Sequence, residues 1–141
     1  MKRVVQLSLK VYLSGATKCL EDQGDSWRKE CERIVDYYDL DVKIYNPNTY
    51  FNYTTMAPDT TKQCMECLLN HVKTSDVILC NLDYTDKSSG TCIELGYAKA
   101  LDIPIIGFGK NVDVYNWAEE MCHCVFDNVI DALMYICGYY Y

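Results

Sequence analysis

The stretch of the chain most able to do chemistry runs over residues 88–98 and carries a single carboxylate, Glu94. It follows an apolar run, residues 77–80, that is typical of a buried strand. We expect a helix to begin at Thr91, so that Glu94 falls in its first turn, near free backbone N–H groups and the positive end of the helix dipole. A carboxylate there stays ionised at neutral pH, which suits a nucleophile or charge stabiliser better than a general acid.

The same residues also have a purely structural interpretation. Thr91 and Glu94 have the spacing of a capping box, in which both side chains accept hydrogen bonds from backbone N–H groups at the helix start. Spacing therefore leaves two alternatives for Glu94, a helix cap or a reactive group. The two are compatible, because the amides that hold a carboxylate also orient it.

Length and charge limit the possible functions. The 141 residues, 50% of them hydrophobic, predict one domain over residues 1–141 with a normal core. The net charge of −7 argues against long nucleic acids as partners, although local N–H groups still allow a small nucleotide. No apolar run reaches membrane-spanning length, so we expect no membrane partner.

Nine cysteines are an unusually high count. Because no signal peptide precedes the first strand-like run, we expect reduced thiols, several of them buried, in a cytoplasmic protein. The pairs Cys64/Cys67 and Cys122/Cys124 raise the question of zinc. However, the first pair falls in an expected helix and the second on an expected strand, whereas zinc knuckles sit in short loops. We therefore expect no metal and no other cofactor.

Periodicity indicates the elements that position these residues. Strands are expected at residues 4–13, 42–45, 76–82, 104–108 and 124–126. A first helix is expected with Asp25 or Ser26 as its N-cap, and further helices at 60–74, 91–101 and 129–137, with a helical turn inside 112–122. The first helix has an apolar stripe that we expect to be buried: Trp27, Cys31, Ile34, Val35 and Tyr38.

Strands that alternate with helices predict a three-layer α/β fold, flavodoxin-like or Rossmann-like, with a five-stranded parallel sheet in the order 2-1-3-4-5. Ligands bind such sheets beyond the carboxyl ends of the strands. The loop at 14–17, the aromatic-rich loop at 48–59 and the turn at 88–94 all fall at that edge. We expect the aromatic loop either to pack against the protein or to stack on a planar ligand.

Several short strings occur in one order along the chain: Tyr12-Leu13-Ser14-Gly15, Trp27-Arg28, Asn46-Pro47, Ser75-Asp76 and residues 90–98. In this order the chain resembles the nucleoside 2-deoxyribosyltransferase family, which includes 2-deoxynucleoside 5-monophosphate N-hydrolases. The resemblance covers nearly the whole chain, and Glu-Leu-Gly-Tyr-Ala at 94–98 is its most specific part. It implies that Glu94 attacks the anomeric carbon of a nucleoside, forming a glycosyl-enzyme that another base or water then resolves.

The resemblance also implies substrate contacts. Tyr12 would hydrogen-bond the nucleophile, although a strand tyrosine half in the core is the structural alternative. Ser88 stands where the transferases have Asp for the 5-hydroxyl and the monophosphate hydrolases have Ser for the 5-phosphate. We expect further substrate contacts from Ser14, Gly15, Asn46, Gly90 and Thr91, with residues 88–91 forming an anion nest or, alternatively, a simple turn.

Near the end of the chain, the resemblance implies a segment that one subunit lends to its neighbour. Met121 would pack against the nucleoside, and Tyr141 could reach a neighbouring site. Glu119 stands where the family has Asn or Ser for the 5-substituent, and its charge would repel a phosphate. This conflicts with Ser88, so the 5-substituent stays open. We expect a homo-oligomer, a dimer or higher, with shared active sites.

One position departs from the family pattern. The Asp that protonates the leaving base is replaced by Leu68, and Glu66 points elsewhere on the same helix. Asp83 and Asp86 could substitute, or they could be ordinary solvated loop carboxylates.

The leading hypothesis is therefore N-glycosidic cleavage or base exchange on a small nucleoside or nucleotide. The alternative is a catalytically weak relative that binds or sequesters a nucleotide, or a cyclic nucleotide signal, without turnover. A flavin-dependent redox protein is a third possibility, but Ser14-Gly15-Ala16-Thr17 matches a flavin phosphate loop only thinly.

Overall fold

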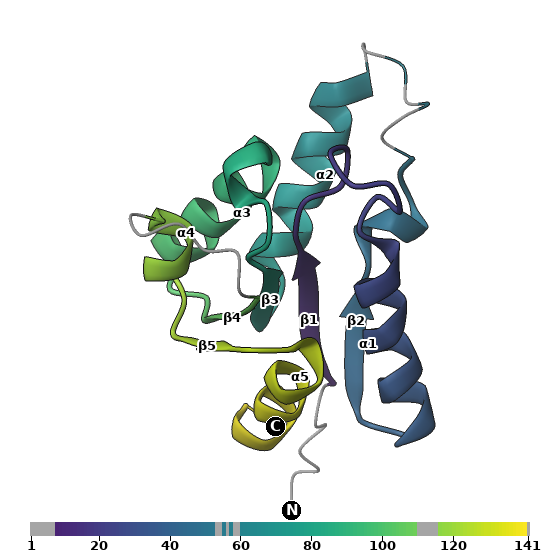
Figure 1. Cartoon of the computed structure of the whole chain (residues 1–141), viewed down its shortest axis with the longest axis vertical. Coiled ribbons are helices and arrows are strands. Elements are labelled where there is room, and N and C mark those ends of the chain that lie inside the picture. The colour runs from purple at the N-terminus through teal and green to yellow at the C-terminus, as the bar shows by residue number, and fades with distance from the viewer. Residues whose placement is uncertain (1–7, 53–54, 56, 58–59, 110–115, 141) are drawn as a thin grey trace, which may run out of the picture.

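The computed structural model describes residues 8–52, 55, 57, 60–109 and 116–140 (Figure 1). Some predicted features lie outside these residues. They are positions 4–7 of the first strand, Tyr53 and Met56 of the aromatic loop, positions 112–115 of the helical turn, and Tyr141. The elements, in chain order, are β1 (Leu9–Ser14), α1 (Asp25–Tyr37), β2 (Val42–Tyr45), α2 (Thr61–Lys73), β3 (Val77–Asn81), α3 (Ser89–Ala100), β4 (Ile105–Phe108), α4 (Trp117–Glu120), β5 (Cys124–Phe126) and α5 (Val129–Tyr139). Short 3-10 turns lie at Pro47–Thr49 and Thr85–Lys87.

The five strands form one sheet in the order β2-β1-β3-β4-β5, and every neighbouring pair is parallel. This confirms the predicted three-layer α/β fold and its strand order. β1 lies between β2 and β3, with Tyr12 opposite Tyr45 on one side and Ile78 on the other. Parallel neighbours bring the carboxyl ends of these strands to one edge of the sheet.

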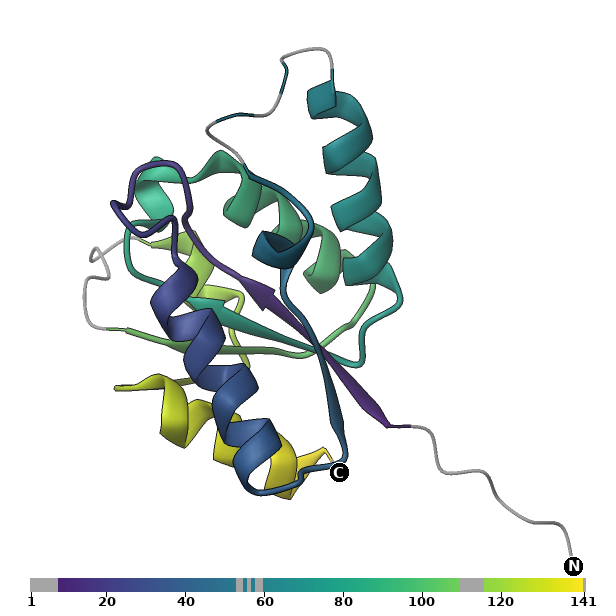
Figure 2. The ribbon, with the colours of Figure 1, turned by 90° about the vertical axis from the view of Figure 1, so that its right-hand side faces the viewer.

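Alternation along the strands divides the core into two clusters, one on each face of the sheet. Figure 2 shows the helices that cover the two faces. Val11 and Leu13 of β1 belong to the cluster beneath α1 and α5, together with Ile34 and Leu133. Tyr12 points to the opposite face and joins the cluster beneath α2, α3 and α4. The alternation of side chains along β1 therefore decides which of them contact α3.

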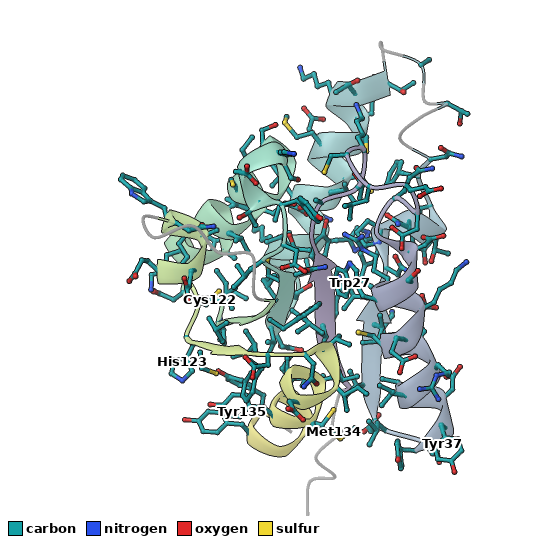
Figure 3. The ribbon with its side chains drawn as sticks, in the orientation of Figure 1. Trp27, Tyr37, Cys122, His123, Met134 and Tyr135 are labelled. Carbon is teal, nitrogen blue, oxygen red and sulfur yellow. The ribbon has the colours of Figure 1, made fainter. Side chains whose placement is uncertain are left out.

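Helix α1 differs from its predicted pattern at both ends. Its N-cap is Gly24, in the left-handed region at φ 73°, and the carboxylate of Asp22 accepts hydrogen bonds from the N–H groups of Gly24 and Ser26. Tyr38 follows the last residue of the helix and is 61% exposed, so the prediction that it is buried was wrong. Figure 3 shows Trp27 toward the sheet and Tyr37 at the outer end of the helix.

Helix α3 begins at Ser89, two residues earlier than predicted, and this changes the setting of Glu94. Its N-cap is Ser88, whose Oγ accepts a hydrogen bond from the N–H of Thr91 at 3.4 Å. Glu94 therefore lies in the second turn, beyond the free N–H groups of the helix start. The capping-box interpretation of Thr91 and Glu94 was wrong.

None of the helices within the described ranges combines the length and the apolar character that crossing a bilayer requires.

Candidate functional site

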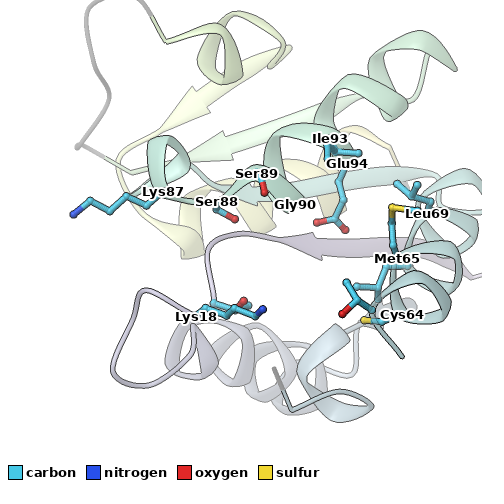
Figure 4. A pocket seen from close by; sticks show the side chains of 13 residues that line it. Lys18, Cys64, Met65, Leu69, Lys87, Ser88, Ser89, Gly90, Ile93 and Glu94 are labelled. Carbon is cyan, nitrogen blue, oxygen red and sulfur yellow. The ribbon is translucent and has the colours of Figure 1, made fainter. Parts of the chain in front are cut away.

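A cavity of about 340 Å³ opens at the carboxyl edge of the sheet, between α2, α3 and the loop that joins β1 to α1 (Figure 4). One side is largely apolar and comes from α2 and α3: Cys64, Met65, Leu68, Leu69 and Ile93. The other side is polar and comes from the β1–α1 loop and the start of α3: Thr17, Lys18, Lys87, Ser88, Ser89 and Gly90. Thr61 and Glu94 complete the lining. The cavity thus brings an apolar surface, hydroxyl groups and one carboxylate together.

The carboxylate of Glu94 is held by two hydroxyl groups of β1. Tyr12 donates its phenolic hydrogen to Oε2, and Ser14 donates to Oε1 at 3.3 Å. Tyr12 and Ser14 are two residues apart on a strand, so both point to the face that α3 covers. This arrangement leaves the carboxylate extended toward the sheet instead of folded onto its own helix amides.

Behind Tyr12, a column of stacked rings supports its position. The rings of Tyr12 and Tyr45 are parallel within 11°, with centroids 5.5 Å apart. Tyr45 stacks in turn on His71, at 3.8 Å, and on Tyr50, at 5.3 Å. Lys10 contacts the Nδ1 of His71 at 3.0 Å. Because Tyr12 is fully buried in this column, its hydroxyl has little freedom to leave Glu94.

Burial raises the pKa of Glu94 to about 7, although the hydrogen bonds from Tyr12 and Ser14 and the positive charge of Arg28 act in the opposite direction. The expectation that this carboxylate stays fully ionised at neutral pH was therefore wrong. That expectation placed Glu94 in the first helical turn. In its actual position, the loss of contact with water raises the pKa more than the neighbouring hydrogen-bond donors and Arg28 lower it. Near pH 7 both protonation states are populated.

Arg28 is a part of the site that the sequence pattern did not assign. It is 1% exposed, and it donates to the backbone carbonyls of Gly15 and Gly24 at 3.0 Å each. Its guanidinium also lies 4.6 Å from the centre of the Trp27 ring. These contacts fix the two ends of the β1–α1 loop, and they place a positive charge close enough to act on Glu94. The signal in the sequence that could have pointed to Arg28 was the Trp27-Arg28 string, which is part of the family resemblance.

Three more predicted residues lie around the start of α3. Ser88 and Gly90 line the cavity, and a Cβ added to Gly90 would meet no atom within 4 Å. Thr91 is buried and forms a 2.7 Å hydrogen bond between its Oγ1 and the Oγ of Ser88. Thr91 therefore does not line the cavity itself but holds Ser88, which does.

Gly15 and Asn46 support the site without lining this cavity. A Cβ on Gly15 would lie 3.0 Å from the Trp27 ring, so the residue is needed for the close approach of loop and helix. Asn46 is buried at the end of β2, where its amide donates to Glu32 and its oxygen accepts from the N–H of Asn48. Their predicted role as substrate contacts stays a prediction.

Glu119 and Met121 are not among the described residues that line the cavity. Met121 borders a separate hollow of about 190 Å³ beside the start of β4, together with Lys99, Asp102, Ile103, Pro104, Ile105 and His123. Figure 3 shows the neighbouring Cys122 and His123 beside β5. That these residues serve the site of another copy stays a prediction, because the structure is of one chain.

The aromatic loop lines a second hollow next to the first. Its volume is about 470 Å³, and its walls are Tyr50, Phe51, Asn52, Thr55, Thr60, Gln63, Cys64 and Cys67. Cys64 borders both hollows, so its side chain is their common wall. Tyr50 packs against Tyr45 and is still 65% exposed. This part of the loop therefore packs against the protein, and stacking on a planar ligand stays a prediction.

No predicted substitute acid lies in the cavity. Leu68 occupies its wall, while Asp83 and Asp86 are not among the described lining residues. In the part of the chain that the structure describes, no three His, Cys, Asp or Glu side chains gather as metal ligands would.

Comparisons with known proteins give the family and the fold of the chain. A sequence model of the family described as nucleoside 2-deoxyribosyltransferase matches residues 11–133. A search of curated proteins gives no significant match.

Among solved structures, 34 chains are significantly similar. A 2-deoxyribosyltransferase of Leishmania mexicana shares 18% identity with a TM-score of 0.73, over 94% of this chain and 99% of that one. A 2-deoxyribosyltransferase of Bacillus psychrosaccharolyticus shares 19% identity with a TM-score of 0.66, over 88% and 90%. A CMP N-glycosidase of Clostridium botulinum shares 16% identity with a TM-score of 0.57, over 92% and 98%. At these identities the likeness shows a common fold.

Proposed function

The chain belongs to the nucleoside 2-deoxyribosyltransferase family, and from this premise we propose that it cleaves or exchanges the N-glycosidic bond of a (deoxy)nucleoside or nucleoside monophosphate. Glu94 is the proposed nucleophile. The observation that carries the proposal is the Glu94 carboxylate at the cavity wall, held by the hydroxyls of Tyr12 and Ser14. A carboxylate fixed in this way can meet the anomeric carbon of a sugar bound in front of it.

The proposed reaction has two steps. One carboxylate oxygen of Glu94 bonds to the anomeric carbon as the bond to the base breaks, and the electron pair of that bond leaves with the base. Water or a second base then attacks the same carbon from the vacated side, releases Glu94 and retains the configuration of the sugar. Tyr12 and Ser14 hold the carboxylate in line before the first step and stabilise its negative charge again as the second step releases it.

For the 5-substituent, the start of α3 favours an anion. Ser88, Ser89 and Gly90 face the cavity at a helix N-terminus, where backbone N–H groups and the helix dipole attract negative charge. Glu119 does not line the cavity within one chain, so the repulsion expected from it is not built into this wall. These features support a 5-phosphate more than a 5-hydroxyl.

The second candidate function, binding without turnover, is favoured by Leu68. An apolar side chain in the wall cannot protonate a leaving base, and such protonation contributes a factor of about 10²–10⁴ in many enzymes. A chain of this kind could hold a nucleotide intact and sequester it or respond to it.

The test is to incubate the wild-type chain and Glu94→Gln with deoxynucleosides and their monophosphates, and to follow free base by chromatography. We expect base release by the wild type and a loss of about 10³-fold or more in Glu94→Gln. Glu66→Gln is a matched control, because Glu66 is an exposed carboxylate on α2. Tight binding of a nucleotide that stays intact would instead support the binding function.

We further propose that the chain assembles into a homo-oligomer with shared sites. Exposed apolar side chains of the last third of the chain support this proposal: Val125, Ile130, Met134 and Tyr139. Mass measurement in solution, with Ile130→Glu as the disrupting variant, tests it. A monomer with full activity would contradict it.

A further inference from the structure

We propose, on the premise that Glu94 attacks the sugar, that the base leaves as an anion paired with the ammonium group of Lys18. The preferred substrates are then nucleosides whose bases carry ring carbonyls next to the glycosidic or another acidic ring nitrogen, such as uracil, thymine and hypoxanthine. Lys18 would be a catalytic residue of the cavity and would set its substrate class.

The first reason is the composition of the cavity wall. Among the described residues that line it, Glu94 is the one carboxylate, and it is committed to the sugar. The side chain of Leu68 has no proton to give. Cys64 has a thiol, but burial raises the pKa of that thiol, so its loss of a proton is disfavoured. The leaving base must therefore depart with little help from a conventional acid.

The second reason is the position of Lys18. It lies on the β1–α1 loop, inside a turn in which the N–H of Leu20 donates to the carbonyl of Thr17 at 3.0 Å. Figure 4 shows its ammonium directed toward the side of the cavity where Cys64 lies. The positive charge of Lys18 also acts on the Cys64 thiol, which agrees with that direction.

The other lysine of the wall has a different setting. The Nζ of Lys87 lies 5.8 Å from the centre of the Tyr84 ring, a cation–π contact. In Figure 4 the Lys87 side chain extends away from the other lining residues. Lys18 is therefore the lysine aimed at a ligand beside the apolar wall.

The charges balance in the proposed step. Glu94 loses its negative charge as its oxygen bonds to the anomeric carbon, and the electron pair of the broken bond carries that charge to the base. In an oxo-substituted base the charge spreads from the ring nitrogen to the carbonyl oxygens, where the ammonium of Lys18 donates hydrogen bonds. The apolar wall from α2 and α3 borders this pairing on one side, while the side chain of Lys18 is exposed to solvent on the other. After release, the base takes a proton from solvent.

The test compares Lys18→Met with Lys29→Met, which removes the same charge from an exposed position on α1. Two substrates are used, thymidine and 4-nitrophenyl 2-deoxyriboside, each with and without a 5-phosphate, and the nitrophenyl leaving group departs readily as an anion. For Lys18→Met we expect kcat on thymidine to fall about 100-fold, with near-normal kcat on the nitrophenyl substrate. Lys18→Arg keeps the charge and should keep most activity on thymidine, and Lys29→Met should match the wild type.

Several results would overturn the proposal: equal losses on both substrates, no loss on thymidine, or a loss confined to the KM of monophosphates, which would make Lys18 a phosphate contact. If Cys64→Ala loses as much activity on thymidine as Lys18→Met does, the thiol of Cys64 also assists the departure of the base, and the assignment to Lys18 alone is wrong. The proposed function fails separately. It fails, and this inference with it, if the wild type cleaves the nitrophenyl substrate neither with nor without the 5-phosphate, or if Glu94→Gln cleaves it equally well.

Discussion

The two faces of the sheet use the same strands for different purposes. On the face beneath α1 and α5, the strands contribute aliphatic side chains and Phe108, which packs edge-to-face against Trp27 at 5.2 Å. On the face beneath α2 and α3, they contribute Tyr12, Ser14 and Tyr45, and a cavity remains at the carboxyl edge. Alternation along β1 thus separates a face that stabilises from a face that positions polar groups, and substitutions should separate these roles.

The largest effect on stability is expected on the α1/α5 face. Leu133 is fully buried there, so Leu133→Ala should lower the free energy of unfolding by about 2–5 kcal/mol through lost burial and the cavity left behind. Activity per folded molecule should stay near the wild-type level. Urea unfolding and an active-site titration measure the two quantities. Met134→Ala is the control, because Met134 is partly exposed on the same helix and its loss should cost little. Equal destabilisation by both would contradict the role of Leu133 in the core beneath α1 and α5.

On the other face, the raised pKa of Glu94 makes stability depend on pH. The folded pKa of about 7 lies above the usual value of 4.5, so Glu94 favours folding below about pH 4.5 and loses that contribution as pH rises through 7. Glu94→Gln should therefore gain stability over the wild type between pH 5 and 8, by roughly 1–2 kcal/mol after allowance for partial exposure. Melting curves at several pH values measure this gain. A gain that stays constant from pH 5 to 8 would contradict it.

A third substitution separates the ring of Tyr12 from its hydroxyl. Tyr12→Phe keeps the stack on Tyr45 but removes a hydrogen bond that lowers the pKa of Glu94. The pH at which activity reaches half its plateau should rise, and activity at pH 7 should fall about tenfold. Ser14→Ala should shift the profile less, because its bond to Glu94 is 3.3 Å long. An unchanged profile in both variants would show that these hydroxyls do not control the carboxylate.

The smallest effect is expected at Gly90. A methyl group there enters open space at the cavity wall, so Gly90→Ala should fold normally and gain up to about 1 kcal/mol from better helix propensity. It should raise the KM of monophosphates a few-fold by narrowing the cavity. Gly96→Ala is the matched control on the same helix, since a Cβ there also meets no atom within 4 Å and Gly96 does not line the cavity. The same KM in both variants would contradict the binding role.

Much of the fold was predictable from the sequence because local patterns determine it. The bounds of β2 and β5 match those predicted, and the alternation of strands with helices led to the correct sheet order. These features depend on periodicity and on short connections, which are visible in a single sequence.

The environment of the site was less predictable because it depends on contacts between distant segments. Ser88 and Thr91 can both cap a helix, so the sequence could not decide where α3 begins. The pKa of Glu94 depends on burial beneath elements far away along the chain. Arg28 is buried because Gly15 and Gly24 offer it carbonyl groups, and helical periodicity contains no information about such partners.

The central place of β1 in the sheet has a consequence for motion. Backbone hydrogen bonds connect β1 to both β2 and β3, so Tyr12 is paired on two sides, while Ser14 is paired with β3. Loops and helix ends can open locally while this ladder stays closed. The amides of Val11 and Tyr12 should therefore be among the last to exchange with deuterium, and the hydroxyl of Tyr12 should keep its place on the carboxylate during such openings.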